Sequence, residues 1–347
     1  QATTGFQLRL GVPVNEYIYF QARYGLSQDD ISLDENTFFS GNPPTCDPIR
    51  AGRFLCDAIG KRLTSSLGYT LLYDDRDNRI RPTRGQSLGI SQDFAGLGGS
   101  VKYIKTRVNA DKYWKPFGNF VFGLSFEGGY IHPLENRGLA GIDDVRLTDR
   151  FYLGEPQMRG FDIRGVGPRV QRIFQEGKIV NGVAVNNPIT DRNQIQDDAI
   201  GGRFYYMGRA ELQIPLGSGA RELGLRPSLF VDVGSVFDVT RPVLQSVQQR
   251  EVLADGTQGG LLYYFVDSAG ALQTSTTAVN GDGSARVAAF RFKEEFLGDT
   301  WKPRLSVGFG VNWNSPFGPF RIDIARALLK QPGDDTKLFT FNVGTQF

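Results

Sequence analysis

Few residues of this chain are of the types that make or break bonds. The only histidine, His132, precedes Pro133 and has no serine motif near it, so the sequence does not indicate a nucleophile–base pair. Two cysteines, Cys46 and Cys56, lie close together in a polar, proline-containing stretch. This spacing predicts a disulfide formed in an oxidising compartment, with two unrelated thiols as the alternative. One histidine and two cysteines do not make a set of metal ligands. We expect no enzymatic activity, no cofactor and no metal.

The composition narrows the class of protein before any strand is placed. The 347 residues include 43 Gly, 26 Phe, 13 Tyr and 3 Trp, with a net charge of +2 and no long run of one sign. A nucleic-acid surface, which is usually a clustered basic patch, is therefore not expected. No run of about 18 apolar residues predicts a transmembrane helix. Strands that cross a membrane expose only every second residue to lipid, so their apolar signal is diluted and is still compatible with this composition.

Apolar and polar side chains alternate along segments of about 9–13 residues, which is the length of tilted membrane-crossing strands. In one such segment, Phe122, Leu124 and Phe126 alternate with Gly123 and Ser125. The same period recurs along the chain and predicts an all-β fold, a transmembrane antiparallel β-barrel. The eleven expected strands lie near residues 4–13, 17–29, 62–74, 85–95, 99–110, 117–131, 202–215, 224–238, 303–314, 318–327 and 336–347.

The connections between these strands differ in length at the two ends of the sheet. Short turns near 13–16, 75–84, 111–116, 216–223 and 315–318 alternate with long loops at 30–61, 132–201 and 239–302, and with shorter connections at 96–98 and 328–335. Outer-membrane barrels have short periplasmic turns and longer extracellular loops, so the C-terminus should be periplasmic. Eleven strands in an open sheet would leave two unpaired edges, which lipid cannot satisfy. We therefore expect a partial barrel that lacks N-terminal strands.

Two acidic residues are expected on the inner wall of the barrel. In the strand at 202–215, the alternation places Phe204 and Leu212 toward lipid and Glu211 toward the lumen. In the next strand, Leu229, Val231 and Val233 face lipid, whereas Phe230, Asp232 and Gly234 face inward. Pleat parity alone therefore places Glu211 and Asp232 on the inner faces of adjacent strands. A polar lumen needs no special role for either acid.

A glycine- and arginine-rich segment of the long loop 132–201 contains a motif that could pair with these two acids. It reads GEPQMRGFDIRGVGPR, and its core Met158, Arg159, Gly160 and Phe161 resembles the [VIM]-R-G-F motif of the BamA family of outer-membrane assembly factors, in the bacterial surface antigen superfamily. Phe230, Asp232 and Gly234 match the F-x-D-x-G element of that family. Similar matches occur in order along essentially the whole chain, in NEYIYFQARYGLS, in YDDRD…PTRG, in NWNSPFGP and in the closing strand TFNVGTQF.

The resemblance implies a fold, a mechanism and partners. The chain would be about the last eleven of about sixteen barrel strands, without the first strands and without the periplasmic POTRA domains. The motif loop would fold back into the lumen, where Arg159 would meet Asp232, Glu211 or both. The closing strand would form a lateral seam with the missing first strand, and it includes Phe339, Phe341, Gly344 and Phe347. The implied partners are nascent outer-membrane proteins, accessory assembly lipoproteins and outer-membrane lipids.

Other functions are compatible with the same residues. A TamA-like factor or an FhaC-like two-partner-secretion transporter belongs to the same superfamily, and the number of upstream POTRA domains would distinguish them. A porin-type channel would need charged rings around an open pore. The segment 132–201 is long enough to plug the lumen instead, and the conductance of the complete protein would separate these two interpretations.

Overall fold

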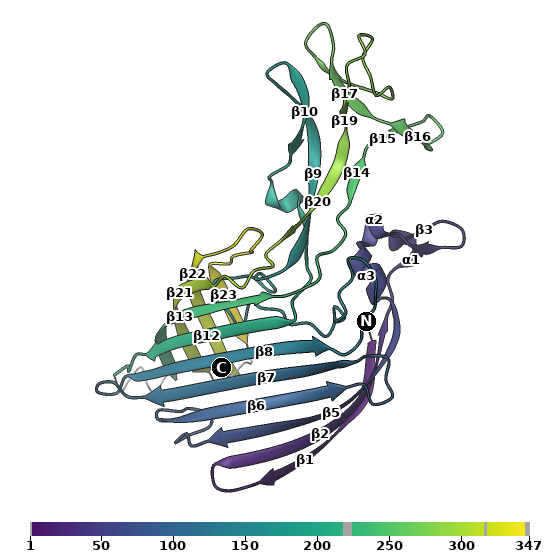
Figure 1. Cartoon of the computed structure of the whole chain (residues 1–347). Helices are drawn as coiled ribbons and strands as arrows, with labels where there is room; N and C mark the ends of the chain where they lie inside the picture. The colour runs from purple at the N-terminus through teal and green to yellow at the C-terminus, as the bar shows by residue number, and fades with distance from the viewer. Residues whose placement is uncertain (1, 218–223, 316–317, 344–347) are drawn as a thin grey trace. The chain divides into compact units, whose positions relative to one another are not determined.

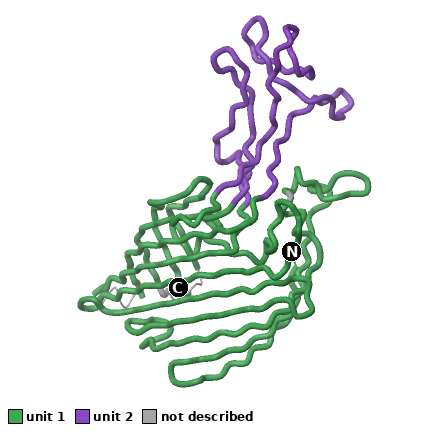
Figure 2. Tube along the Cα trace, in the orientation of Figure 1, with its two compact units in different colours: residues 1–168, 199–241, 298–347 green, residues 169–198, 242–297 purple. Residues whose placement is uncertain are grey.

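The structure, a computed structural model, describes residues 2–217, 224–315 and 318–343. It forms two compact units, which Figure 2 colours separately. Unit 1 consists of residues 1–168, 199–241 and 298–347, and unit 2 consists of residues 169–198 and 242–297. Within the described part of the chain, no helix is both long enough and apolar enough to span a membrane.

Unit 1 is built on one eleven-stranded antiparallel sheet (Figure 1). Each strand pairs with the strands that precede and follow it among these eleven, because every connection returns the chain alongside the strand it has just left. The eleven strands are β1 (Ala2–Pro13), β2 (Ile18–Ile31), β5 (Gly60–Asp74), β6 (Gly85–Ala95), β7 (Tyr103–Trp114), β8 (Val121–Pro133), β12 (Phe204–Gln213), β13 (Leu225–Phe237), β21 (Arg304–Ser315), β22 (Gly318–Leu329) and β23 (Phe339–Val343). The predicted fold class, a partial antiparallel barrel, is confirmed.

The observed strands differ most from the expected approximate bounds at one hairpin and at the start of the last strand. β7 begins at Tyr103 and not near residue 99, because residues 96–100 are a glycine-rich connection. At its other end β7 runs on to Trp114, which pairs with Phe122 of β8, so the turn lies at 115–120. β23 begins at Phe339, because Thr336 forms a bridge with Phe161 of the motif loop instead of continuing the sheet.

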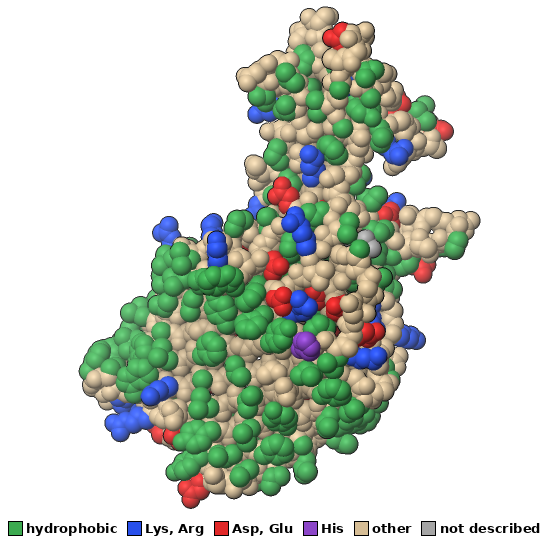
Figure 3. All heavy atoms as spheres, viewed as in Figure 1, with side chains coloured by type: hydrophobic (Ala, Val, Ile, Leu, Met, Phe, Trp, Pro, Cys, Tyr) green, Lys and Arg blue, Asp and Glu red, His purple; other side chains and the backbone are tan. Residues whose placement is uncertain are grey.

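The two faces of the sheet differ in polarity, as the alternation predicted. Across β8, β12, β13 and β21, one row of paired residues is Leu124, Ala210, Val231 and Val307, and the adjacent row on the other face is Ser125, Arg209, Asp232 and Ser306. We call the face with the second row the lumen face and the other the outer face. Figure 3 shows hydrophobic side chains spread over the outer face of this sheet.

The connections of unit 1 that the structure describes sort by end, as expected, whereas residues 218–223 and 316–317 of the expected turns at 216–223 and 315–318 lie outside the described residues. One end of the strands, the short-turn end, has the connections 14–17, 75–84 and 115–120. The opposite end, the long-loop end, has connections at 32–59, 134–203, 238–303, 96–102 and 330–338. The first of these holds small elements closed by the disulfide: α1 (Glu35–Phe38), β3 (Phe39–Ser40), β4 (Thr45–Cys46), α2 (Pro48–Ala51) and α3 (Arg53–Ala58).

Unit 2 shows that two of the expected long loops have sheets of their own. It contains β9 (Arg169–Val180), β10 (Val183–Pro188), a short 3₁₀ helix (Arg192–Gln194), β11 (Gln196–Ala199), β14 (Ser246–Gln248), β15 (Arg250–Val252), β16 (Gln258–Leu261), β17 (Tyr263–Val266), β18 (Leu272–Ser275), β19 (Val287–Ala288) and β20 (Phe290–Leu297). Its small core is formed by Ala184, Tyr264 and Ala289. The ion pair Arg172–Glu294, at 2.9 Å, joins its two chain segments.

Candidate functional site

The motif loop folds back against the lumen face of unit 1. Leu153 bridges Val166 within the loop, and the Met158 amide donates to the Gly154 carbonyl at 2.8 Å, so the motif sits on a tight, self-paired segment. Met158 and Phe161 are fully buried in a hydrophobic cluster that also contains Ile131, Val145, Phe151, Leu153, Val166, Met207 and Val236. This burial turns the side chain between them, Arg159, toward the sheet.

Asp232 on β13 is the main partner of Arg159. One carboxylate oxygen of Asp232 accepts from Arg159 Nε at 2.8 Å and from the Arg159 backbone amide at 3.1 Å, and the other accepts from a terminal guanidinium nitrogen at 2.7 Å. Such a forked contact fixes the orientation of the guanidinium as well as its position. The Arg159 side chain is 3% exposed and that of Asp232 is 0% exposed, so the pair is withdrawn from water.

Two further carboxylates surround the same guanidinium. Glu211 on β12 accepts from Arg159 at 3.0 Å, and Asp323 on β22 lies 3.8 Å from it. The sequence left open whether Arg159 meets Asp232, Glu211 or both, and the structure shows it in contact with both. Arg321 pairs with Asp323 at 2.8 Å and with Glu211 at 3.4 Å, and Arg209 donates to Asp232 at 3.1 Å. Three arginines therefore balance three acids.

The ring of Phe230 packs against the flat face of the Arg159 guanidinium. The Arg159 guanidinium carbon lies 3.3 Å from the centre of the Phe230 ring, a stacking contact that stabilises a cation and leaves its edge free for hydrogen bonds. Phe230 pairs directly with Glu211 on one side and with Gly308 on the other. A Cβ at Gly308 would lie 2.5 Å from a carbon of the Phe230 ring, so this glycine makes room for the aromatic side chain.

The glycines of the two motifs allow close approach of the loop to the wall. Gly160 has a φ of +84°, which L-residues with a Cβ rarely adopt. A Cβ there would also lie 2.9 Å from Ser306 Cβ and 3.3 Å from Ala325 Cβ. At Gly234, a Cβ would lie 2.8 Å from the Tyr206 carbonyl oxygen and 3.0 Å from a methyl group of Leu153. Both positions therefore need glycine for the loop to pack on the sheet.

A second set of contacts ties the motif loop to the connection that leads into β23. The Lys337 amide donates to the Gly160 carbonyl at 3.2 Å, and the Asp162 amide donates to the Asp335 carbonyl at 3.0 Å. The Lys337 ammonium donates to the Glu155 carboxylate at 2.8 Å. This hydrogen bond raises the pKa of Lys337 above its usual range, although the side chain is partly exposed. The loop thus fixes residues 335–337 immediately before the last strand.

Several residues of this site escaped the sequence analysis. Ser306 on β21 donates to the Arg159 carbonyl at 2.5 Å, and Arg321 and Asp323 complete the charge network from β22. Arg209 on β12 donates to the Gln157 carbonyl of the loop at 2.6 Å. The alternation along FRIDIA places Arg321 and Asp323 inward as well, so pleat parity could have identified them.

The remaining predicted positions lie away from this network. Cys46 and Cys56 form a disulfide, which confirms that prediction. Next to it, an ion pair links Arg137 to Asp57. Phe339 and Phe341 are exposed on the outer face of β23, at 53% and 51%. The predicted seam residues Gly344 and Phe347 lie outside the described residues.

The charged side chains of this network hold the motif loop against the lumen face of the sheet through ion pairs with one another. Arg159 bridges carboxylates on β12, β13 and β22, and Ser306 of β21, the strand between β13 and β22, donates to the Arg159 carbonyl. Among the described residues, no three His, Cys, Asp or Glu side chains gather as a metal site would require. The network thus connects the motif loop, the sheet and the residues that lead into β23.

Comparison with known proteins supports the resemblance carried by these motifs. A model of the Omp85 superfamily domain matches residues 1–347. The outer membrane protein assembly factor BamA of Neorickettsia risticii (strain Illinois) is 27% identical over 84% of this chain and 28% of its own length. The BamA of Neisseria meningitidis serogroup B is 24% identical over 99% of this chain and 36% of its own length. The human sorting and assembly machinery component 50 homolog is 29% identical over 52% of this chain and 33% of its own length.

A solved structure has the same fold. The crystal structure of BamA from Haemophilus ducreyi lacking POTRA domains 1–3 superposes with a TM-score of 0.60 at 18% identity, covering 98% of this chain and 53% of that one. The chain spans between 28% and 36% of the length of the three relatives named above. These matches confirm the resemblance that the motifs predicted.

Proposed function

Because this chain belongs to the Omp85 superfamily, we propose that it forms barrel strands of an outer-membrane assembly factor, which folds client β-barrel proteins into the outer membrane of a Gram-negative-type cell. The names of the relatives, outer membrane protein assembly factor and sorting and assembly machinery component, support assembly over translocation. In this proposal the long-loop end faces the cell exterior, and the C-terminus and short-turn end face the periplasm. Nascent outer-membrane proteins, accessory lipoproteins and lipids are its proposed partners.

The observation that carries the proposal is the position of the last strand at an edge of the sheet. Among the described residues, β23 pairs with β22 from Phe320↔Val343 to Ile324↔Phe339. No described strand pairs with the other edge of β23. Backbone groups on such an edge can accept a further strand, and this mode of recognition tolerates many sequences because it uses main-chain hydrogen bonds.

The motif loop would hold this edge in place. Thr336 bridges Phe161, and the Lys337 amide donates to the Gly160 carbonyl, just before β23 begins at Phe339. Arg159, anchored on β12, β13 and β22, therefore fixes both the loop and the entry to the last strand. A fixed entry with an edge strand beyond it would allow the edge to open locally while the rest of the sheet stays folded. No bond is made or broken in such a cycle.

Site-specific cross-linking of a client tests the proposal. A photoreactive p-benzoylphenylalanine in place of Phe341, on the outer face of β23, should cross-link to an unfolded outer-membrane protein during its assembly by the full-length factor in liposomes. The same replacement at Val108, on the outer face of β7 in the middle of the sheet, is the matched control and should give little cross-linking.

The outcome separates the competing functions. Cross-links from position 341 to the client's C-terminal strand, with client folding detected by heat-modifiable gel mobility, would support the edge mechanism. Equal cross-linking from both positions would argue against it. Passage of a secreted polypeptide into the liposome interior, with no folded barrel product, would instead indicate a TamA-like or two-partner-secretion activity.

A further inference from the structure

A buried ion pair joins β21 to the connection that leads into the last strand. Arg304, the first residue of β21, donates from Nε to one carboxylate oxygen of Asp334 at 3.0 Å and from a terminal nitrogen to the other at 3.1 Å. Both side chains are 0% exposed, so this forked contact is withdrawn from water. Among the described residues, the ion-pair partners of Arg159 are other carboxylates, so the two pairs are separate.

The other donors of Arg304 hold its guanidinium on the sheet. The terminal nitrogens also donate to the Ser235 hydroxyl at 2.8 Å, to the Thr300 carbonyl at 3.0 Å and to the Gly298 carbonyl at 2.9 Å. Ser235, on β13, itself donates to the Thr300 carbonyl at 2.7 Å. Every nitrogen of the guanidinium is thereby bonded. A lysine has a single ammonium group and could not reach all of these acceptors at once.

Asp334 also closes a tight turn in the connection 330–338. Its carboxylate accepts from the Gln331 amide at 2.6 Å, and its own amide donates to the Gln331 carbonyl at 3.1 Å. Gly333, within this turn, has a φ of +90°, in the left-handed region that favours glycine. The same carboxylate therefore shapes the turn and ties it to β21.

The side chains of β23 do not by themselves fix how this strand pairs with β22. Phe341 lies opposite Ile322, and Phe339 lies opposite Ile324. All four side chains are exposed on the outer face. A shift of two residues would bring Phe339 opposite Ile322, keep each side chain on its face and still pair two apolar residues. The register of a hairpin is otherwise set by its connection, so the register of β23 depends on how residues 330–338 are held.

We propose that Arg304 and Asp334 are positioning residues that set the register of β23 on β22. A shift of two residues would move the strand by about 7 Å along its neighbour. With Asp334 fixed, the segment before Phe339 is too short to absorb that movement, and its amides at Asp335 and Lys337 are already bonded to the motif loop. The consequence for a client rests on the proposed function, because a strand that adds to β23 would then meet it in one register.

Disulfide trapping in the full-length protein in liposomes reads the register directly. Ile322→Cys with Phe341→Cys, the native pair, should cross-link under copper phenanthroline, because directly opposed residues lie within disulfide range. Ile322→Cys with Phe339→Cys, the shifted pair, should cross-link little, because diagonal neighbours lie about 7–8 Å apart. Cys46 and Cys56 are already bonded to each other and do not compete.

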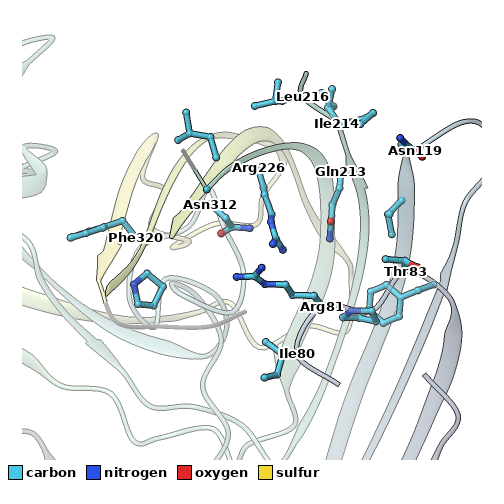
Figure 4. Close-up of a pocket in the computed structure, with 17 residues that line it drawn as sticks. Ile80, Arg81, Thr83, Asn119, Gln213, Ile214, Leu216, Arg226, Asn312 and Phe320 are labelled. Carbon is cyan, nitrogen blue, oxygen red and sulfur yellow. The ribbon is translucent and has the colours of Figure 1, made fainter. Parts of the chain in front are cut away.

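Variants of the ion pair should allow the shift. Asp334→Asn should raise the ratio of shifted-pair to native-pair cross-linking at least about tenfold, because it leaves the Arg304 charge buried and unpaired. Arg304→Lys keeps the charge but not the fork, so it should act in the same direction and serves if Asp334→Asn does not fold. Arg81→Lys makes the same change on the β5–β6 connection, where Figure 4 shows Arg81 at a pocket of the short-turn end, and should leave the ratio within about twofold.

Unchanged heat-modifiable mobility identifies the variants that remain folded. The proposal is overturned if folded variants at Asp334 and Arg304 keep the original ratio, or if Arg81→Lys raises it equally. Loss of both cross-links would make the pair a general structural contact, and a shift seen in Arg159→Ala alone would assign the register to the motif loop. The trapping needs no client, so it is decided independently of the Phe341 cross-link that tests the assembly proposal.

Discussion

Among single residues, Arg159 makes contacts of several kinds, and all of them hold it in the same buried position. Its guanidinium is held by carboxylates at its edge and by the Phe230 ring at its face, while its backbone amide and carbonyl are bonded to Asp232 and Ser306. Each contact alone would contribute modestly to stability, but they share one buried position. Removing one partner leaves the others buried and partly unsatisfied, and that penalty is larger than the net contribution of the bond.

The carboxylates of Asp232 and Glu211 should therefore contribute differently to the stability of the folded protein. Asp232 accepts three hydrogen bonds from Arg159 and one from Arg209, whereas Glu211 accepts one from Arg159 and a longer one, at 3.4 Å, from Arg321. We expect Asp232→Asn to lower the free energy of unfolding by about 3–5 kcal/mol. Glu211→Gln should lower it by about 1.5–3 kcal/mol. Denaturant titration of the full-length protein in detergent micelles, followed by heat-modifiable gel mobility, measures both.

Equal destabilisation by the two substitutions would show that the three acids act as one shared charge and that the geometry at Asp232 has no special weight. Intact protease protection of the loop 151–168 in Asp232→Asn would contradict the anchoring role altogether. The conservative pair Asn and Gln keeps the volume of each side chain, so a difference between the variants reports charge and hydrogen bonding and not a cavity.

At the level of strands, alternation alone predicted the number of strands in the sheet, their order and their faces. The pattern failed where it was interrupted: the polar Asp111 and Lys112 suggested a turn, yet Tyr113 and Trp114 continue β7 in register with β8. The alternation also contained Arg321 and Asp323 on the lumen face. They were passed over because a polar residue inside a barrel does not reveal its partner until the loop is placed.

The contacts between the motif loop and the last connection could not be predicted from local pattern. Phe161 and Thr336 are far apart in the chain, and neither belongs to an alternating segment that would predict the bridge between them. The same holds for the sheets of unit 2, where short strands such as β14 and β15 are stabilised by neighbours from distant segments. The local sequence pattern predicts which face of the sheet each strand residue occupies. Pairing between distant segments depends instead on how the whole chain packs.

The difference between the two faces gives a test on a single strand. Val108 and Asn109 are consecutive in β7, but Val108 lies on the outer face and Asn109 lines a lumen cavity. Val108→Lys should destabilise the folded protein in liposomes by about 2–4 kcal/mol if it lies near the middle of the bilayer. Asn109→Lys should change stability by no more than about 0.5 kcal/mol, because its side chain stays in a polar, wet space.

Both variants add the same charge at adjacent positions, so strand propensity and expression affect them alike. Denaturant titration in liposomes compares them directly. If Asn109→Lys were the more damaging substitution, the assignment of the two faces in β7 would be reversed, and the positions of Asp232 and Glu211 would need to be re-examined with it.

On the scale of the whole of unit 1, the motif loop contacts both the sheet and the connection that leads into the last strand. The loop packs a hydrophobic cluster against β8, β12 and β13, and its charged end reaches β22. From there it continues to residues 335–337, which precede the last strand. A substitution of Arg159 is therefore expected to have effects at two places. One is the lumen, where the motif loop lies, and the other is the edge of the sheet, where β23 begins.

Conductance measures the first of these consequences and separates a plugged barrel from an open channel. In planar bilayers, the full-length protein should show small and intermittent conductance, since the loop occupies the lumen, whereas a porin-type channel would show a large, steady one. Arg159→Ala should raise the conductance by releasing the loop from Asp232 and Glu211. Arg164→Ala is the control, because it removes the same charge from the same loop at an exposed position whose guanidinium rests on Tyr152. If both variants conduct like the unmodified protein, the ion-pair network does not hold the loop in place. The role of Arg159 would then lie in folding and not in keeping the lumen closed.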